Sequence, residues 1–305
     1  MTYPAIPRTV EMIVTHGGCH DGFAAEWLLH NRWPDAAVHQ AAYNENIDRL
    51  VAAAPRNREM TDPASVLVMA DFSYKLPEMV RLADAWDRII LLDHHASAID
   101  ALDGHLPPNV EAVFDVERSG AGIVADWLDV RPSRKGLVDY VEDRDLWRFA
   151  LPDSKAIAAR IGATPHTYAD YDDLDEALRS VSGLEGEPSR RAQRVVEDGM
   201  LLLAYRDVLI AELVDAARPT KIGDIDVLAV PSPYNLGSDV AGVLAEQSPS
   251  GVGVYYRDLP GRIEFGLRST PDGPDVAKIA EQFGGGGHPH ASGFRIEVDS
   301  WAALI

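Results

Sequence analysis

Hydrophobic positions in the first 130 residues follow two alternating patterns. Short apolar runs of strand length occur at residues 10–17, 37–43, 65–72, 88–95 and 110–116. The segments 23–33, 76–86 and 120–130 instead place apolar residues at helical spacing. Strands that alternate with helices predict an α/β fold, with a mostly parallel sheet covered by helices on both faces.

The remaining sequence predicts a long helix and a second domain. Residues 134–182 are mainly helical in pattern, and an amphipathic run over 189–217 follows the breaker-rich "GLEGEPS". Beyond it, strand patterns and helical pieces predict a smaller α/β domain. We therefore expect a first domain over 1–185, a connecting helix over 186–217 and a second domain over 218–305.

Polar side chains gather where three of the predicted strands end. Open α/β sheets bind ligands outside the carboxyl ends of their strands, so these clusters predict one site. The residues are His16, Cys19 and Asp21 after the first strand, Asp71 after the third, and Asp93, His94 and His95 after the fourth.

Carboxylates and imidazoles in this arrangement favour divalent metal ions. A pair of ions about 3.5–4 Å apart is a common device for attack on phosphorus, and it needs a bridging carboxylate, for which Asp71 is the candidate. A lone Asp at a strand end is more often a cap or turn residue. The coincidence of three clusters at one edge favours the metal site.

The C-terminal "GGGGHPHASG" suggests a phosphate-binding turn. Successive glycines lack Cβ atoms, so their N–H groups can approach a phosphate closely, and His288 would add a polar contact. Arg268, at the end of a predicted strand, could clamp a phosphate with its guanidinium. Taken alone, the run is equally well explained as a flexible loop and the arginine as a surface residue.

Composition restricts the partners. The 305 residues carry a net charge of −20, which disfavours a long nucleic-acid track or an anionic membrane surface. The sequence has no apolar run long enough to span a membrane and no signal-peptide pattern, so we expect a cytoplasmic protein. Its single cysteine cannot form an internal disulfide. The sequence leaves the oligomeric state open, with a homodimer as one option.

These motifs resemble the DHH phosphoesterase family in the form that carries the DHH-associated C-terminal domain. "LLDHHAS" is similar to the motif that names the family, and "MADFS" to its second motif. "LRSTPDGPDVAKIAEQFGGGGHPHASGF" is similar to the signature of the C-terminal domain. The resemblance covers nearly the whole chain and implies hydrolysis of phosphoesters with two divalent cations, typically manganese, in a cleft between two domains.

The resemblance also implies roles for individual residues. The implied metal ligands are His16, Asp21, Asp71 as the bridge, His94, and Asp143 in "EDRDLW", with Asp145 as the alternative to Asp143. His95 is similar to the neighbour that contacts the substrate and acts with Asp71 in catalysis. The implied phosphate-binding residues are Arg268, His288 and the glycines 284–287, which include Gly285, Gly286 and Gly287.

One position departs from the family pattern. Cys19 stands where the first motif has its first aspartate. We expect it to be a ligand, so that zinc, iron or cobalt are alternatives to manganese at that site. A packing role for Cys19, a role as nucleophile, and ligation by His20 in its place are the other interpretations.

The predicted activity is hydrolysis of short oligonucleotides or small phosphorylated nucleotides to mononucleotides by a water activated by two metal ions. Other substrates within the resemblance are bisphosphorylated adenosine, cyclic dinucleotides, pyrophosphate and polyphosphate. The change at Cys19 raises one alternative from another class, a nucleotide-binding or regulatory protein with an impaired metal site.

Overall fold

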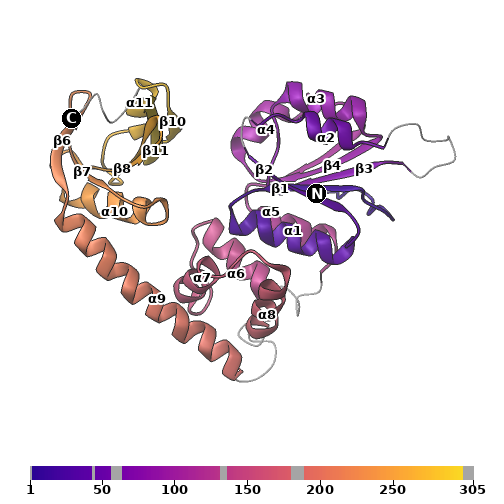
Figure 1. Cartoon of the computed structure of the whole chain (residues 1–305), viewed down its shortest axis with the longest axis horizontal. Coiled ribbons are helices and arrows are strands. Elements are labelled where there is room, and N and C mark those ends of the chain that lie inside the picture. Colours follow the sequence, from indigo (N-terminus) through magenta and orange to yellow (C-terminus); the bar gives the residue numbers. More distant parts are fainter. Residues whose placement is uncertain (1, 43–44, 56–63, 131–135, 180–188, 298–305) are drawn as a thin grey trace. The chain divides into compact units, whose positions relative to one another are not determined.

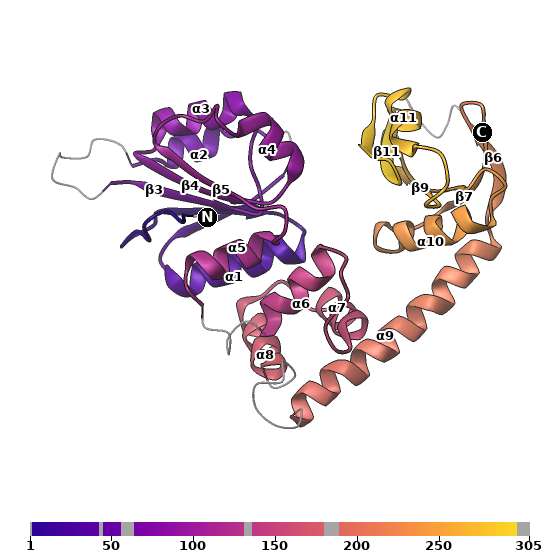
Figure 2. The ribbon, with the colours of Figure 1, turned by 180° about the vertical axis from the view of Figure 1, so that it is seen from behind.

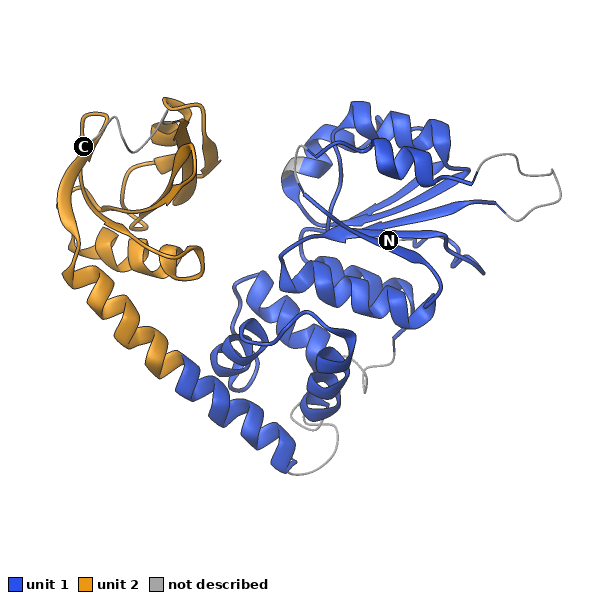
Figure 3. Ribbon diagram, in the orientation of Figure 1, with its two compact units in different colours: residues 1–202 blue, residues 203–305 orange. Residues whose placement is uncertain are grey.

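The computed structural model describes residues 2–42, 45–55, 64–130, 136–179 and 189–297. The chain divides into two compact units, residues 1–202 and 203–305 (Figure 3). The division lies inside α9 (Arg190–Asp215), the long helix that the sequence predicts over 189–217. The predicted end of the first domain at residue 185 lies outside the described residues.

Unit 1 is built on a five-stranded sheet, in which every pair of neighbouring strands is parallel. The strand order is β2-β1-β3-β4-β5. The predicted parallel sheet is therefore confirmed, with each strand slightly shorter than its apolar run. The strands are β1 (Met12–His16), β2 (Ala37–Ala41), β3 (Val66–Ala70), β4 (Arg88–Asp93) and β5 (Val110–Phe114).

Helices cover both faces of this sheet, as predicted (Figures 1 and 2). Side chains alternate along a strand, so Met12 and Val14 of β1 join one core cluster and Ile13 joins the other. The helices of unit 1 before α9 are α1 (His20–Arg32), α2 (Asp48–Ala53), α3 (Leu76–Ala85), α4 (Ala96–Leu102), α5 (Gly120–Trp127), α6 (Gly136–Asp145), α7 (Ser154–Gly162) and α8 (Tyr168–Leu178). The last three fall in the region predicted to be helical.

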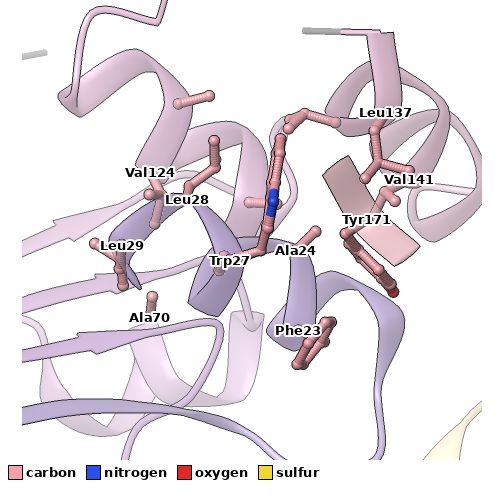
Figure 4. Packing of buried hydrophobic residues seen from close by; sticks show 14 of the residues in the cluster. Phe23, Ala24, Trp27, Leu28, Leu29, Ala70, Val124, Leu137, Val141 and Tyr171 are labelled. Atoms are coloured by element: carbon pink, nitrogen blue, oxygen red, sulfur yellow. The ribbon is translucent and has the colours of Figure 1, made fainter. Parts of the chain in front are cut away.

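Helix α1 is enclosed by its neighbours. Phe23, Trp27 and Leu28 of α1 pack in the same cluster as Val124 of α5 and Tyr171 of α8 (Figure 4). Each large apolar side chain buried in this way contributes about 1.5–3 kcal/mol to stability. This packing fixes the first turn of α1, which contains Asp21 and directly follows Cys19.

Unit 2 contains a six-stranded sheet with the order β10-β11-β9-β8-β7-β6. Only the pair β7 and β8 is parallel among its described strands. Helices α10 (Tyr234–Gln247) and α11 (Val276–Glu281) pack on it. The strands are β6 (Arg218–Ile222), β7 (Ile225–Pro231), β8 (Val252–Leu259), β9 (Arg262–Ser269), β10 (Gly286–His288) and β11 (Ala291–Glu297).

The glycine run is partly a strand. Gly286, Gly287 and His288 form β10, which pairs antiparallel with β11 at the edge of the sheet. The sequence indicated only a turn or loop there, because the run lacks the β-branched residues typical of strands. None of the helices in the described part of the chain has the length and apolarity that a membrane span requires.

Candidate metal centre

Three neighbouring strands bring the predicted ligands together. Strands β1, β3 and β4 lie side by side in the sheet and run in the same direction. His16 is the last residue of β1, Asp71 follows β3 directly, and Asp93 is the last residue of β4. Since the carboxyl ends of parallel strands meet at one edge of the sheet, the side chains at these three strand ends lie close together.

Asp71 lies at the centre of this region. Its Oδ1 is 3.1 Å from His94 Nε2, and its Oδ2 is 3.7 Å from His16 Nδ1. The side chain is 1% exposed, yet Oδ2 has no partner at hydrogen-bonding distance. Asp71 also has a φ of 57°, a left-handed conformation that is uncommon for residues other than glycine. A strained residue with a buried, unsatisfied oxygen is typical of a functional position.

One side of Asp71 carries His94 and two further carboxylates, and we call these three residues the His94 side. His94 Nε2 lies 3.8 Å from Asp21 Oδ2 and 3.7 Å from Asp145 Oδ2. Asp21 accepts hydrogen bonds from the N–H groups of Gly120 and Ala121 at the start of α5. These bonds and the positive end of the α5 dipole hold the Asp21 carboxylate in place.

The other side of Asp71 carries His16 and Cys19, which we call the Cys19 side. One possible ligand atom from each of His16, Cys19 and Asp71 lies within 4.8 Å of the other two. His20 belongs to another cluster, because its Nδ1 lies 3.0 Å from Tyr171 Oη and 2.9 Å from His166 Nε2. The structure thus brings Cys19, and not His20, together with His16 and Asp71.

His95 is oriented by Asp93. Asp93 Oδ1 accepts a hydrogen bond from His95 Nδ1 at 2.7 Å and others from the backbone N–H groups of His94 and His95. The hydrogen bond to Asp93 raises the pKa of His95. His95 also forms a possible ligand group with Asp71 and His94. Sequence reasoning placed Asp93 in the cluster without a role, and the structure gives it this orienting contact.

The buried carboxylates raise each other's affinity for protons, and the nearby imidazoles lower it. Burial and the nearby Asp71 and Asp145 charges raise the pKa of Asp21 well above its ordinary value. Burial would also raise the pKa of Asp71, but the imidazoles of His16 and His94 lower it to about 2. For His94 the effect of burial is overcome by the hydrogen bond to Asp71 and by the surrounding carboxylates, which raise the pKa to about 9. The cluster therefore attracts positive charge.

Asp143, the predicted fourth-motif ligand, is placed elsewhere. Its carboxylate accepts hydrogen bonds from the N–H groups of Ala150 and Leu151 and from the Ser154 hydroxyl. Asp145 is the residue whose carboxylate approaches His94. The two residues lie near the end of α6 and are separated by about 200° around a helix, so they cannot face the same side. We therefore replace Asp143 by Asp145 in the candidate ligand set.

Two glycines that the sequence interpretation overlooked permit this packing. A Cβ at Gly120 would lie 2.4 Å from Asp71 Cβ, and a Cβ at Gly22 would lie 2.3 Å from the His16 carbonyl oxygen. Both positions therefore require glycine. A signal was present in "SGAG" at the start of α5, where glycine within a helix is otherwise unfavourable.

These residues fit divalent metal ions. The donor set of carboxylates, imidazoles and one thiol is the set that borderline and hard divalent ions use. The unsatisfied Asp71 Oδ2 and the clustered carboxylates provide the negative charge that such ions neutralise. The possible ligand groups are His16, Cys19 and Asp71; Asp71, His94 and His95; and Asp21, His94 and Asp145.

The predicted phosphate-binding residues lie in unit 2. Arg268 on β9 donates from Nη2 to Ser238 Oγ at 2.6 Å and from Nη1 to its neighbour's carbonyl oxygen. The strand register pairs Ala291 with both Arg268 and His288, so the three residues form one row across β9, β11 and β10. Gly287 has a φ of 142°, and a Cβ there would lie 2.6 Å from the Ala291 carbonyl oxygen. Glycine is therefore required beside this row.

Three solved structures are similar to this chain over nearly its whole length. An exopolyphosphatase-related protein from Bacteroides fragilis has a TM-score of 0.47 and 14% identity, over 97% of this chain and 89% of that chain. A pGpG-specific phosphodiesterase from Vibrio cholerae has a TM-score of 0.48 and 13% identity, over 96% of both chains. The exonuclease RecJ bound to manganese has a TM-score of 0.47 and 16% identity, over 94% of this chain and 86% of that chain.

At the level of sequence, an uncharacterized protein of Acanthamoeba polyphaga mimivirus is 25% identical over 307 residues, covering 93% of this chain and 67% of that protein. Residues 237–305 match the model of the DHHA1 domain, and this range contains Arg268, the glycine run and His288. The motif "DHH" itself occupies positions 93–95 at the end of β4, beside Asp71. The chain therefore matches the DHHA1 domain over residues 237–305, and its unit 1 carries the "DHH" motif at the candidate metal centre.

Proposed function

We propose that the chain is a metal-dependent phosphodiesterase that hydrolyses short oligonucleotides or small phosphorylated nucleotides to mononucleotides. The observation that carries this proposal is the position of Asp71. Its Oδ1 lies near His94 and its Oδ2 near His16, and His16 and Asp71 form a possible ligand group with Cys19. One buried carboxylate with both oxygens directed at ligand groups suits a bridge between two divalent ions.

The side chains divide the work of the proposed reaction. His16, Cys19, Asp21, Asp71, His94 and Asp145 would hold two divalent ions, for which we propose manganese, with zinc, iron or cobalt as alternatives on the Cys19 side. Such ions lower the pKa of a bound water and neutralise charge on phosphoryl oxygens. Asp93 holds His95 through Nδ1, which leaves Nε2 as the atom that hydrogen-bonds a phosphate oxygen or assists the leaving group.

The substrate class is proposed from charge and from unit 2. A net charge of −20 would repel a long polyanion, whereas a ligand with one or two phosphates needs only local cations. Arg268 can present a planar guanidinium to a phosphate. The glycine run leaves open space at Gly286, where an added Cβ would meet no atom within 4 Å, while the N–H groups of Gly284 and Gly285 donate to Glu281 and Ala280. We propose Arg268, Gly285, Gly286, Gly287 and His288 as the residues that bind it. Short nucleotides are favoured over long DNA for these reasons.

The test is hydrolysis of a 5′-phosphorylated dinucleotide by the full-length protein with Mn²⁺, followed by separation of the products. We expect mononucleotides to appear, and chelation of the metal to stop the reaction. Asp84→Asn is a matched control, because Asp84 is an exposed residue of α3 that lies outside the cluster.

A substrate panel makes the outcome specific. It contains dinucleotides, bisphosphorylated adenosine, cyclic dinucleotides and pyrophosphate, each with Mn²⁺, Zn²⁺, Fe²⁺ and Co²⁺. Turnover of pyrophosphate or cyclic dinucleotides alone would replace the proposed substrate class. Binding of the dinucleotide without turnover under all four metals would show a nucleotide-binding protein instead of an enzyme of this specificity.

A further inference from the structure

We propose that His16, Cys19 and Asp71 form a thiolate-containing metal site that prefers a softer ion, such as zinc, over manganese. This inference rests on the proposed function for the presence of a metal and goes beyond it by deriving, from ligation through Cys19 Sγ, which ion this side of Asp71 prefers. It concerns a residue of this chain that departs from the family motif. The geometry of the Cys19 side, together with the chemistry of sulfur, supports it.

The first support is an oxygen that lacks a partner. Asp71 is 1% exposed, and its Oδ2 is buried without a hydrogen-bond partner at bonding distance. One ligand atom from each of His16, Cys19 and Asp71 fits within 4.8 Å, the spacing expected around a single ion. A buried carboxylate oxygen without a hydrogen-bond partner is destabilising, and a cation at this point would satisfy it.

The second support is the way in which Cys19 is held. Cys19 is the N-terminal capping residue of α1, with an extended backbone at φ −116° and ψ 141°. Because the first turns of α1 are buried, the backbone of Cys19 is held in a fixed position.

The third support is that neighbouring donors are engaged elsewhere. His20 pairs with Tyr171 and His166. Asp21 faces Gly120, Ala121 and His94. In the described part of the chain, Cys19 is therefore the donor of this turn that joins His16 and Asp71 in a possible ligand group.

Sulfur changes which ion such a site prefers. Thiolate is a softer ligand than carboxylate and favours zinc, and manganese prefers oxygen ligands. On ligation the Cys19 thiol loses its proton to solvent, and the Sγ electron pair is donated to the ion. No oxidation state changes in this step. A site with nitrogen, sulfur and oxygen donors consequently differs from the His94 side, which offers oxygen and nitrogen only.

Cobalt titration of the metal-free, full-length protein tests this assignment. A cobalt ion bound by thiolate shows an intense sulfur-to-metal charge-transfer band in the near ultraviolet. Cys19 is the only cysteine among the 305 residues, so any such band must come from it. We expect the band in the wild type and its complete loss in Cys19→Ser.

Two further variants sharpen the test. His20→Asn should keep the charge-transfer band, because His20 bonds to Tyr171 and His166 instead of an ion. Cys19→Asp should lower the ratio of zinc to manganese retained after dialysis against equal amounts of both, as measured by elemental analysis. Thermal melts of each variant check that it is folded.

The outcomes separate this inference from the proposed function. Absence of the band in the wild type, or loss of cobalt binding in His20→Asn with retention in Cys19→Ser, would overturn the ligand role of Cys19. Manganese-dependent hydrolysis could still occur in that case, and the proposed function would stand. A clear band without hydrolysis of any substrate would support Cys19 as a ligand and contradict the proposed function.

Discussion

The two sides of Asp71 differ in ligand chemistry and in how they are held. The His94 side combines one imidazole with the carboxylates of Asp21 and Asp145, and Asp21 is fixed by two N–H groups of α5. The Cys19 side combines one imidazole with one thiol on the turn between β1 and α1. A single buried carboxylate thus faces a harder and a softer ligand set.

This difference indicates where the chain can vary without loss of the centre. Asp21 is buried and accepts hydrogen bonds from two N–H groups of α5. A replacement without a carboxylate would leave these N–H groups without a partner. Cys19 makes no side-chain cap hydrogen bond at the start of α1. Position 19 can therefore hold either a carboxylate or a thiol, whereas the packing against α5 requires a carboxylate at position 21.

The largest effect is expected from Asp71→Asn, which changes both sides at once. An amide cannot bridge two cations as a carboxylate does, and the loss of several kcal/mol of charge stabilisation corresponds to a fall of about 10³-fold in kcat. Dinucleotide hydrolysis with Mn²⁺ measures the effect, with Asp84→Asn as control. Activity within a few-fold of the wild type would remove the bridging role.

The next largest effect should distinguish Asp145 from Asp143. Asp145→Asn removes one carboxylate from the His94 side, and we expect metal affinity and turnover to fall by about 10–100-fold with little change in stability. Asp143→Asn should instead lower the free energy of unfolding by about 1–3 kcal/mol, because it weakens the contacts to Ala150, Leu151 and Ser154.

Metal titration and chemical denaturation of both variants provide the measurements. The reverse pattern, with Asp143→Asn stable and inactive and Asp145→Asn active, would restore Asp143 as the ligand. In that event the end of α6 would rearrange when the metal binds.

The sequence predicted the sheet and most of the cluster, because both depend on local patterns. Apolar runs fix the strands. His16 ends the first of them, and Asp71 and His94 directly follow β3 and β4 at the same edge. Asp143 and Asp145 could not be separated in this way, because the direction of a side chain at a helix end depends on the turn that follows. The partner of His20 was equally hidden, since Tyr171 and His166 are more than 140 residues away, at separations of 151 and 146.

A smaller effect is expected from Gly120→Ala, which lies below both sides. The added methyl group would approach Asp71 Cβ to 2.4 Å, so either α5 or Asp71 must move. Overpacking of this kind typically costs about 1–3 kcal/mol. Denaturant unfolding should show this loss together with weaker metal binding.

Gly162→Ala is the matched control for this variant. Gly162 ends α7, and a Cβ there would meet no atom within 4 Å. We expect its stability to stay the same or to rise slightly, because alanine is favoured over glycine in helices. Equal effects of the two substitutions would mean that the space beside Asp71 is not restricted.

The smallest effect is expected from His20, the residue that follows Cys19, through its lowered pKa. Burial, His166 and Arg144 lower the pKa of His20 from 6.5 to about 4, and the pKa of His166 is lowered as well, chiefly by burial. The folded protein then binds fewer protons than the unfolded chain below pH 6.5, so the free energy of unfolding should fall as the pH falls toward 4. The slope from His20 alone is at most about 1.4 kcal/mol per pH unit.

Denaturation of the metal-free protein between about pH 7 and pH 5 measures this dependence. His20→Asn should flatten it, whereas substitution of the exposed His105 should leave it unchanged. An unchanged slope in His20→Asn would mean that burial and the neighbouring His166 and Arg144 do not hold His20 neutral in the folded protein.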